Sequence, residues 1–196
     1  MENSICSIEQ LKDHIDLSPI EEKNLKQIIQ KHPMSVTPYY MSLIDKDNPD
    51  DPIRKMAIPS IEEVNLEGSY DTSGEAENTV MSGLQHKYSE TALILATNKC
   101  AMYCRHCFRK RLVGLQTKEV LERFEDAAEY IKKNQTINNV LITGGDPLVL
   151  ENRVIERFLS ILSEIPQLKF IRFGSRAPVT FPSRFTDEKL LGILSE

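Results

Sequence analysis

The sequence has little of what would place it in a membrane, outside the cell or on nucleic acid. No apolar run approaches the ~20 residues that a membrane-spanning helix needs, so we expect no membrane association. The first residues, 1–7, lack a basic start followed by an apolar stretch, and no secretory signal is expected. The net charge of −5 argues against a nucleic-acid partner, because such proteins usually carry an excess of positive charge.

The composition that remains is that of an ordinary soluble globular protein. The 196 residues are 40% hydrophobic and 27% charged, which is enough for one domain with a real core. Only four cysteines are present, and three of them lie within eight residues, 100–107. Such clustering is a poor disulfide framework and is typical of a metal site in a cytoplasmic protein.

The start of the chain, 1–44, is predicted to be a helical segment. Ser7 and Gln10 have the spacing of a capping box at the start of a first short helix. Ser18 and Glu21 have the same spacing around a proline, which is the usual arrangement at the start of a helix. Two capped helices are therefore expected in this part.

The rest of the chain divides into two parts by composition. Residues 45–90 are rich in Pro, Asp, Asn, Gly and Ser, and we expect an irregular connecting segment there. From residue 91 to 196, strand and helix patterns alternate three times, which indicates an α/β core domain with a parallel sheet and helices on its outer face. Strands are expected at 92–97, 139–143 and 168–173, with Thr117 capping the first helix, 154–162 lining the second and 186–188 starting the third.

The central motif is Cys100, Cys104 and Cys107 in the loop after the first strand. Loops at the carboxyl ends of parallel strands are where α/β folds place their chemistry. Three thiolates can hold three irons of a 4Fe–4S cube, and the open fourth iron could chelate S-adenosylmethionine. The alternative is structural zinc, which needs four ligands. No second cysteine pair follows, Cys6 is remote, and His106 adjoins Cys107 too closely for easy joint chelation.

Two further motifs have competing interpretations. The glycine turn Gly144, Gly145 and Asp146 ends the second strand, and it is either a tight turn or part of a ligand site. The basic run 105–111 is either a solvated face or a nucleic-acid patch, and the acidity of the chain disfavours the patch.

At this point the sequence resembles a known family. Cys-x3-Cys-x2-Cys-Phe after a first strand is similar to the radical S-adenosylmethionine superfamily. The longer string 98–114 resembles the lysine 2,3-aminomutase family specifically. Further segments that resemble this family are 37–44, 51–59, 141–147 and 172–178. The resemblance covers about residues 35 to 196.

The resemblance implies a fold and a reaction. The fold is a partial barrel of six βα units, here truncated to about three units and preceded by the helical segment. The cofactors are a 4Fe–4S cluster, S-adenosylmethionine and pyridoxal 5'-phosphate. The adenosyl radical removes hydrogen from the β-carbon of an amino acid, and the amino group migrates from C2 to C3, which is an isomerase reaction. The cofactors carry this chemistry and the protein orients them. The partners implied are an amino acid substrate and an electron donor such as flavodoxin or ferredoxin.

The resemblance also assigns residues to ligands. It places Arg109 on the substrate carboxylate, which suits a planar guanidinium. It places the glycine turn 144–146 near the methionine part of S-adenosylmethionine. Ser175 and Arg176 would line the same site, with a simple turn as the competing interpretation. Lys87 would contact the phosphate of pyridoxal phosphate, although the arginine expected downstream is replaced by Thr91.

His106 is expected beside the cofactor ligands, where a structural hydrogen bond is as good an interpretation as a catalytic role. The catalytic residues themselves are not assigned.

Several alternatives for the substrate and for the role of the chain stay open. The substrate could be lysine, glutamate or another amino acid, or the product could be β-lysine for a translation factor. The chain could also be a non-catalytic iron–sulfur or zinc-binding fragment. In the family, the lysine that holds pyridoxal phosphate lies beyond Glu196. We therefore expect an incomplete form that is inactive alone and that acts as a homo-oligomer or with a separate C-terminal half.

Overall fold

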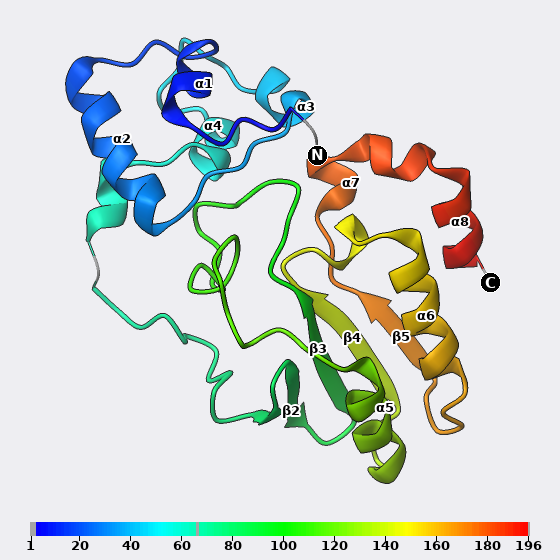
Figure 1. The fold of residues 1–196 in the computed structure, drawn as a ribbon. Helices are drawn as coiled ribbons and strands as arrows, with labels where there is room; N and C mark the ends of the chain where they lie inside the picture. Colours follow the sequence, from blue (N-terminus) through cyan, green and yellow to red (C-terminus); the bar gives the residue numbers. More distant parts are fainter. Residues whose placement is uncertain (1–2, 66, 196) are drawn as a thin grey trace.

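One five-stranded sheet forms the framework of the molecule in the computed structural model, which describes residues 3–65 and 67–195. The strand order follows the sequence, β1-β2-β3-β4-β5. The first two strands pair antiparallel, and β2 pairs antiparallel with β3, whereas β3, β4 and β5 are parallel. Their bounds are Thr79–Met81, Leu84–Tyr88, Thr91–Thr97, Asn139–Gly144 and Phe170–Phe173. The expected α/β fold with a parallel core is confirmed, and the sheet is open rather than closed into a barrel (Figure 1).

Two amphipathic helices cover one face of this sheet: α5 (Phe124–Lys133) and α6 (Asn152–Ser163). Their apolar side chains share a core with the strands, where Ile94 and Ile142 are fully buried. The rings of Phe124 and Phe158 stack with their centroids 4.0 Å apart and join the two helices. Each such buried side chain contributes about 1.5–3 kcal/mol of transfer free energy. This packing fixes the strands, and with them the loops at their ends.

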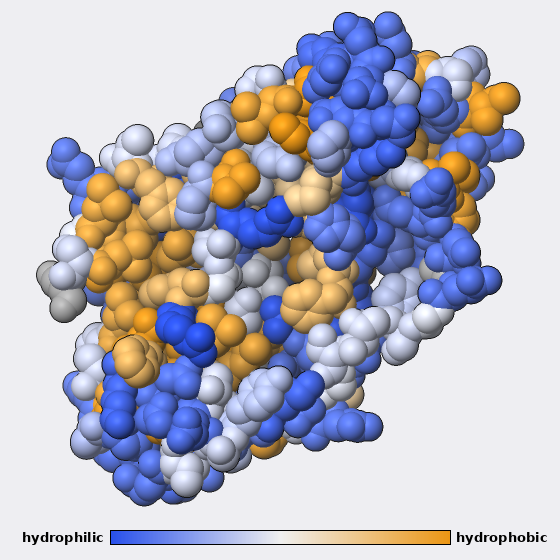
Figure 2. All heavy atoms as spheres, turned by 180° about the vertical axis from the view of Figure 1, so that it is seen from behind, coloured by the Kyte–Doolittle hydropathy of each residue, from blue (hydrophilic) through white to orange (hydrophobic). Residues whose placement is uncertain are grey.

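The opposite face of the sheet has a different character. Because side chains alternate along a strand, Leu93 and Leu141 pair on this face, and both are only half-buried. Phe170 on the edge strand β5 is 62% exposed. Figure 2 shows the molecule from behind Figure 1, with apolar side chains exposed among polar ones.

No helix within the described ranges combines the length and hydropathy of a membrane span.

The N-terminal part folds into short helices around a second core (Figure 1). Both predicted capping boxes are confirmed, with Ser7 and Ser18 as the N-caps of α1 and α2. Met102, from the loop that follows β3, is buried in this second core. The helical part is therefore packed directly against the loop that carries the cysteines. Its helices are α1 (Ile8–Lys12), α2 (Pro19–Lys31), α3 (Pro38–Ser42) and α4 (Pro52–Ala57), followed by the short turn η1 (Ile61–Val64).

The expectation of an irregular segment over 45–90 was wrong in part. This stretch contains α4, η1 and the hairpin of β1 and β2. Asp51 caps α4 by accepting hydrogen bonds from the backbone N–H groups of residues 53 and 54. Gly83, with a φ of +76°, makes the hairpin turn. These elements are three to six residues long, too short for a periodic pattern, and their caps and turns gave the segment its loop-like composition.

The expected cap at Thr117 was also wrong. Helix α5 begins at Phe124, with Arg123 in the N-cap position. The Thr117 hydroxyl instead accepts from the backbone N–H of Glu119 in a local turn. The backbone N–H of Leu121 donates to the carbonyl of Leu95 at 2.9 Å. This bond holds residues 117–121 against β3, so the helix begins only at Phe124.

The last predicted helix is confirmed, although short turns precede it. The Asp187 carboxylate accepts from the backbone N–H groups of Lys189 and Leu190 and caps α8 (Glu188–Ser195). The sequence did not predict three short turns: η2 (Pro147–Val149), α7 (Ala177–Thr180) and η3 (Pro182–Thr186).

Candidate functional site

The loop after β3 is held in place at both ends and in the middle. Its base closes through a hydrogen bond from the Gly114 N–H to the Asn98 carbonyl at 2.8 Å. In the middle, the N–H of Tyr103 donates to the carbonyl of Ser35, and that of Arg105 donates to the carbonyl of Met56, both at 2.9 Å. The helical part of the chain therefore fixes the loop that carries the three cysteines.

The three thiols of this loop are half-buried and lie near one another. Cys100 and Cys107 pack against an apolar cluster made by Leu95, Leu112 and Val113. Burial raises the pKa of Cys100, and the neighbouring Asp146, Cys107 and Cys104 raise it further. Burial also raises the pKa of Cys104. A metal bound here would displace protons from these thiols, because thiolates are the ligands.

The donor set fits a cluster of several irons. The cysteines form no disulfide among the described residues. Within residues 3–65 and 67–195, no group of three or more His, Cys, Asp or Glu side chains is arranged to hold a metal ion, so the case for a cluster rests on the residue types and their spacing. A zinc ion needs its four donors around a single centre, whereas a 4Fe–4S cube spreads three thiolates over three irons. Three nearby thiolates on one short loop with an apolar shell are the donor set that the cube uses.

The glycine turn after β4 packs directly onto the start of this loop. The Gly145 N–H donates to the Thr97 carbonyl at 2.5 Å, and the Asp146 N–H donates to the Lys99 carbonyl at 2.7 Å. A Cβ atom at Gly145 would lie 2.3 Å from the Lys99 carbonyl oxygen. Gly144 has a φ of +114°, and a Cβ there would lie 2.4 Å from the Thr97 carbonyl oxygen. Both glycines are therefore required for contact between the two loops.

The carboxylate of Asp146 connects the loops after β4 and β5. Asp146 is 4% exposed. Its Oδ1 accepts from the Leu148 N–H at 3.0 Å and from the Ser175 hydroxyl at 2.7 Å, and its Oδ2 accepts from the Arg176 N–H at 2.8 Å. Sequence reasoning expected Asp146, Ser175 and Arg176 to contact a ligand. The structure brings them together through bonds to one another.

Arg176 connects the loop after β5 to the cysteine loop. Its Nη1 donates to the Sγ of Cys104 at 2.8 Å. The loops after β3, β4 and β5 thus meet at one point, as expected for the carboxyl ends of parallel strands. No sequence signal pointed to this contact between residues 72 positions apart.

Arg109 is buried against a carboxylate that sequence reasoning missed. Arg109 is 6% exposed and Glu75 is 4% exposed. The Nε and Nη2 atoms of Arg109 donate to Glu75 Oε1 at 2.9 and 2.7 Å, and its Nη1 donates to the Thr143 hydroxyl at 3.3 Å. Arg111 donates to the other oxygen of Glu75 at 2.6 Å. Burial would raise the pKa of Glu75, but hydrogen bonds from the two arginines outweigh it and hold that pKa below 4.5.

A second acid from the connecting segment pairs with the rest of the basic run. Glu63 receives hydrogen bonds from Arg105 and Lys110. The run is therefore not a solvated face, because Glu63 and Glu75 pair with its members inside the fold. Nothing in the spacing of the acids over 45–90 identifies which of them do so, since the pairing depends on the tertiary fold.

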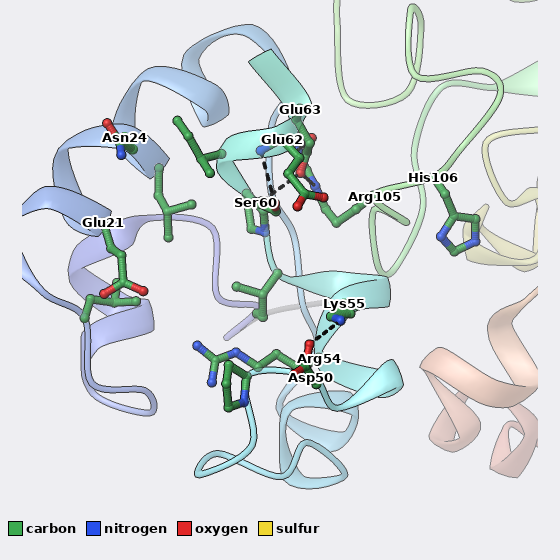
Figure 3. A pocket seen from close by; sticks show the side chains of 16 residues that line it. Glu21, Asn24, Asp50, Arg54, Lys55, Ser60, Glu62, Glu63, Arg105 and His106 are labelled. Atoms are coloured by element: carbon green, nitrogen blue, oxygen red, sulfur yellow. Dashed lines mark hydrogen bonds and ion pairs between the residues drawn. The ribbon is translucent and has the colours of Figure 1, made fainter. Parts of the chain in front are cut away.

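His106 and Lys87 lie in other surroundings. His106 is exposed and, with Arg105, lines a cavity of about 620 Å³ whose remaining walls come from α2, α4, η1 and the turns beside them (Figure 3). The cysteines are not among the residues that line this cavity. Lys87 on β2 donates to the Ser73 carbonyl at 2.9 Å.

Comparison with known proteins identifies this arrangement. The sequence matches the radical SAM superfamily over residues 94–194, which include all three cysteines, the glycine turn and Arg176. The chain belongs to the radical SAM superfamily. Membership implies a 4Fe–4S cluster and S-adenosylmethionine, which the three-cysteine loop fits.

Individual relatives of this radical SAM chain are 2,3-aminomutases. It is 42% identical to the L-lysine 2,3-aminomutase of Acetoanaerobium sticklandii over 189 residues, which cover 95% of this chain and 46% of the relative. It is 39% identical to the L-lysine 2,3-aminomutase of Clostridium subterminale, with 95% and 45% covered. It is 36% identical to the glutamate 2,3-aminomutase of Clostridioides difficile, with 96% and 45% covered. The chain spans about half the length of these curated relatives.

Proposed function

We propose that this chain serves a pyridoxal phosphate-dependent radical SAM 2,3-aminomutase, with L-lysine as substrate and β-lysine as product. The observation that carries the proposal is the cysteine loop, held among the loops of three parallel strands, in a chain 39–42% identical to lysine 2,3-aminomutases. Glutamate is the second candidate substrate, since one relative at 36% identity is a glutamate 2,3-aminomutase.

The three cysteines would hold the cluster, one thiolate on each of three irons. The cluster and S-adenosylmethionine, when bound, supply the radical that starts the reaction. The apolar side chains around Cys100 and Cys107 would shield bound irons from water. The short loop and its backbone hydrogen bonds hold the sulfurs in place before any ligand arrives.

Arg109 is the proposed anchor for the substrate carboxylate. A guanidinium has five N–H donors, and contacts among the described residues use three of them. Glu75 occupies the edge formed by Nε and Nη2, and one hydrogen on each of Nη1 and Nη2 is not used by the contacts within residues 3–65 and 67–195. Those two hydrogens suit the bidentate geometry of a carboxylate.

The other partners are proposals as well. Lys87 is the proposed contact for the phosphate of pyridoxal phosphate, and Ser175 and Arg176 lie at the proposed S-adenosylmethionine site. A small electron donor such as flavodoxin or ferredoxin would reduce the cluster. The proposed compartment is the cytoplasm, where thiols stay reduced.

Turnover tests this proposal. The anaerobically reconstituted chain is incubated with a reductant, S-adenosylmethionine, pyridoxal phosphate and either lysine or glutamate. Because the relatives are about twice as long, a parallel arm adds the separately expressed C-terminal half of a lysine 2,3-aminomutase. Formation of β-lysine in either arm, lost in Cys104→Ala, supports the proposal. Cleavage of S-adenosylmethionine with no β-amino acid from either substrate in both arms contradicts it.

A further inference from the structure

The contact between Arg176 and Cys104 has a consequence for the redox chemistry of the site. We propose that Arg176, through its hydrogen bond to the Sγ of Cys104, raises the reduction potential of the cluster, and that Asp146 is the positioning residue that holds Arg176 there. This inference rests on the proposed cluster at Cys100, Cys104 and Cys107.

The geometry for this role is built into the loops. Cys104 Sγ lies 2.8 Å from Arg176 Nη1. The backbone of Arg176 is fixed by its N–H donating to Asp146 Oδ2, and the preceding Ser175 hydroxyl donates to Oδ1. Asp146 is fixed in turn by its own N–H on the Lys99 carbonyl, one residue before Cys100. The arginine is thus positioned relative to the cysteine loop by a closed chain of hydrogen bonds.

The direction of the effect follows from electrostatics. Reduction adds one electron to the cluster and makes its sulfur ligands more negative. A guanidinium is always positively charged, and a charge-assisted hydrogen bond favours the more negative, reduced form. Hydrogen bonds to sulfur are one of the factors that set iron–sulfur potentials. The side chain of Arg176 is exposed, so solvent weakens its long-range charge, and the direct N–H to sulfur contact carries the effect.

A purely structural role for Arg176 predicts something different. If the arginine only linked the loops, its replacement would reduce cluster content or stability and leave the potential of the bound cluster unchanged. The midpoint potential therefore separates the two roles.

The test is a redox titration of the reconstituted chain without S-adenosylmethionine, so that contact with that ligand does not enter. Arg176→Gln removes the donor cation, and Arg172→Gln is the matched control. Arg172 is an exposed arginine on the neighbouring strand β5, and it bonds Asn139 rather than a thiol. Arg176→Gln should shift the midpoint to a more negative value, and each tenfold loss in the one-electron equilibrium appears as 59 mV. Arg172→Gln should match the wild type.

Asp146→Asn tests the positioning role. It should shift the potential in the same direction as Arg176→Gln, because a carboxamide cannot accept at both of the atoms that hold residues 175 and 176. The double variant Asp146→Asn/Arg176→Gln should show no larger shift than Arg176→Gln alone, since both changes remove one contact. Additive shifts would contradict the positioning role of Asp146.

The outcomes separate this inference from the proposed function. A wild-type chain that takes up no iron overturns both. A wild-type cluster whose potential is the same in Arg176→Gln and Arg172→Gln overturns only the inference. If Arg176→Gln loses the cluster altogether, Asp146→Asn decides: it keeps the arginine but removes the acceptor that holds its backbone, and an unaltered potential there overturns the inference.

Discussion

Replacement of Glu75 by glutamine should destabilise the fold strongly, although the two side chains have nearly the same volume. Glu75 bridges Arg109 and Arg111, and all three donor–acceptor distances lie between 2.6 and 2.9 Å. Its side chain is 5% exposed, and those of the two arginines are 7% and 17% exposed. Glu75→Gln keeps the volume and one acceptor oxygen but leaves the buried Arg109 guanidinium without its counter-charge and leaves Arg111 paired with Glu119 alone.

The expected loss is about 3 kcal/mol. Breaking a buried ion pair by removing one partner typically costs about 3–5 kcal/mol, and the retained amide oxygen favours the lower end. Glu119→Gln is the matched control, because Glu119 also pairs with Arg111 but is 42% exposed. An exposed pair is worth about 0–1 kcal/mol.

Urea unfolding of the metal-free chain at pH 7, followed by circular dichroism, measures both variants. With a slope of about 1–3 kcal/mol per M, a loss of 3 kcal/mol lowers the Glu75→Gln midpoint by about 1–3 M. The Glu119→Gln midpoint should move by less than a third of that shift. Equal small shifts in both variants would refute the reasoning, because the buried bridge would then contribute no more than a surface pair.

Three further predictions concern contacts, pH and the substrate anchor. Gly145→Ala should weaken cluster binding and lower the free energy of unfolding by about 1–3 kcal/mol, because its Cβ would overlap the Lys99 carbonyl. Gly192→Ala in α8 is the control, because the space around Gly192 is open, and it should be neutral or stabilising by about 0.4–1 kcal/mol in the same unfolding assay. The pKa values of Glu63 and Glu75 are lowered in the folded state, because their ion pairs outweigh the opposing effect of burial. Their contribution to stability is therefore present above pH 4.5 and is lost as the pH falls through the lowered pKa values. Unfolding curves between pH 7 and 3 should show this loss, and Glu75→Gln should make the dependence on pH weaker. In the two-part turnover assay, Arg109→Lys should raise the Michaelis constant more than tenfold, equivalent to about 1.5–3 kcal/mol, while the iron content stays unchanged; an unaltered Michaelis constant would rule Arg109 out as the anchor.

The sequence predicted the parts of the fold that have a regular pattern. β3, β4 and the start of α2 follow from apolar runs and a capping box, which are local signals. The hairpin of β1 and β2 was missed because such short strands carry no period and gain their stability from pairing with β3. Tertiary contact likewise overrode the cap expected at Thr117.

The candidate site was predictable only where the residues are adjacent in sequence. The three cysteines can be recognised by their spacing, and the glycine turn can be recognised by its position at the end of a strand. Glu75, Glu63 and the bond from Arg176 to Cys104 were not predictable, because they join positions 34 to 72 residues apart through the packing of separate loops.

The measurement that tests the central claim most directly is the iron content of the anaerobically reconstituted chain. The wild type and Cys6→Ala, which removes the exposed cysteine outside the loop, should each bind about four irons per chain, as one 4Fe–4S cube requires. Both should show an electron-spin resonance signal, after reduction, that changes when S-adenosylmethionine is added. Cys104→Ala should lose the irons and the signal. A colourless wild-type chain that holds a single zinc ion, or an iron content that Cys104→Ala leaves unchanged, would contradict the account.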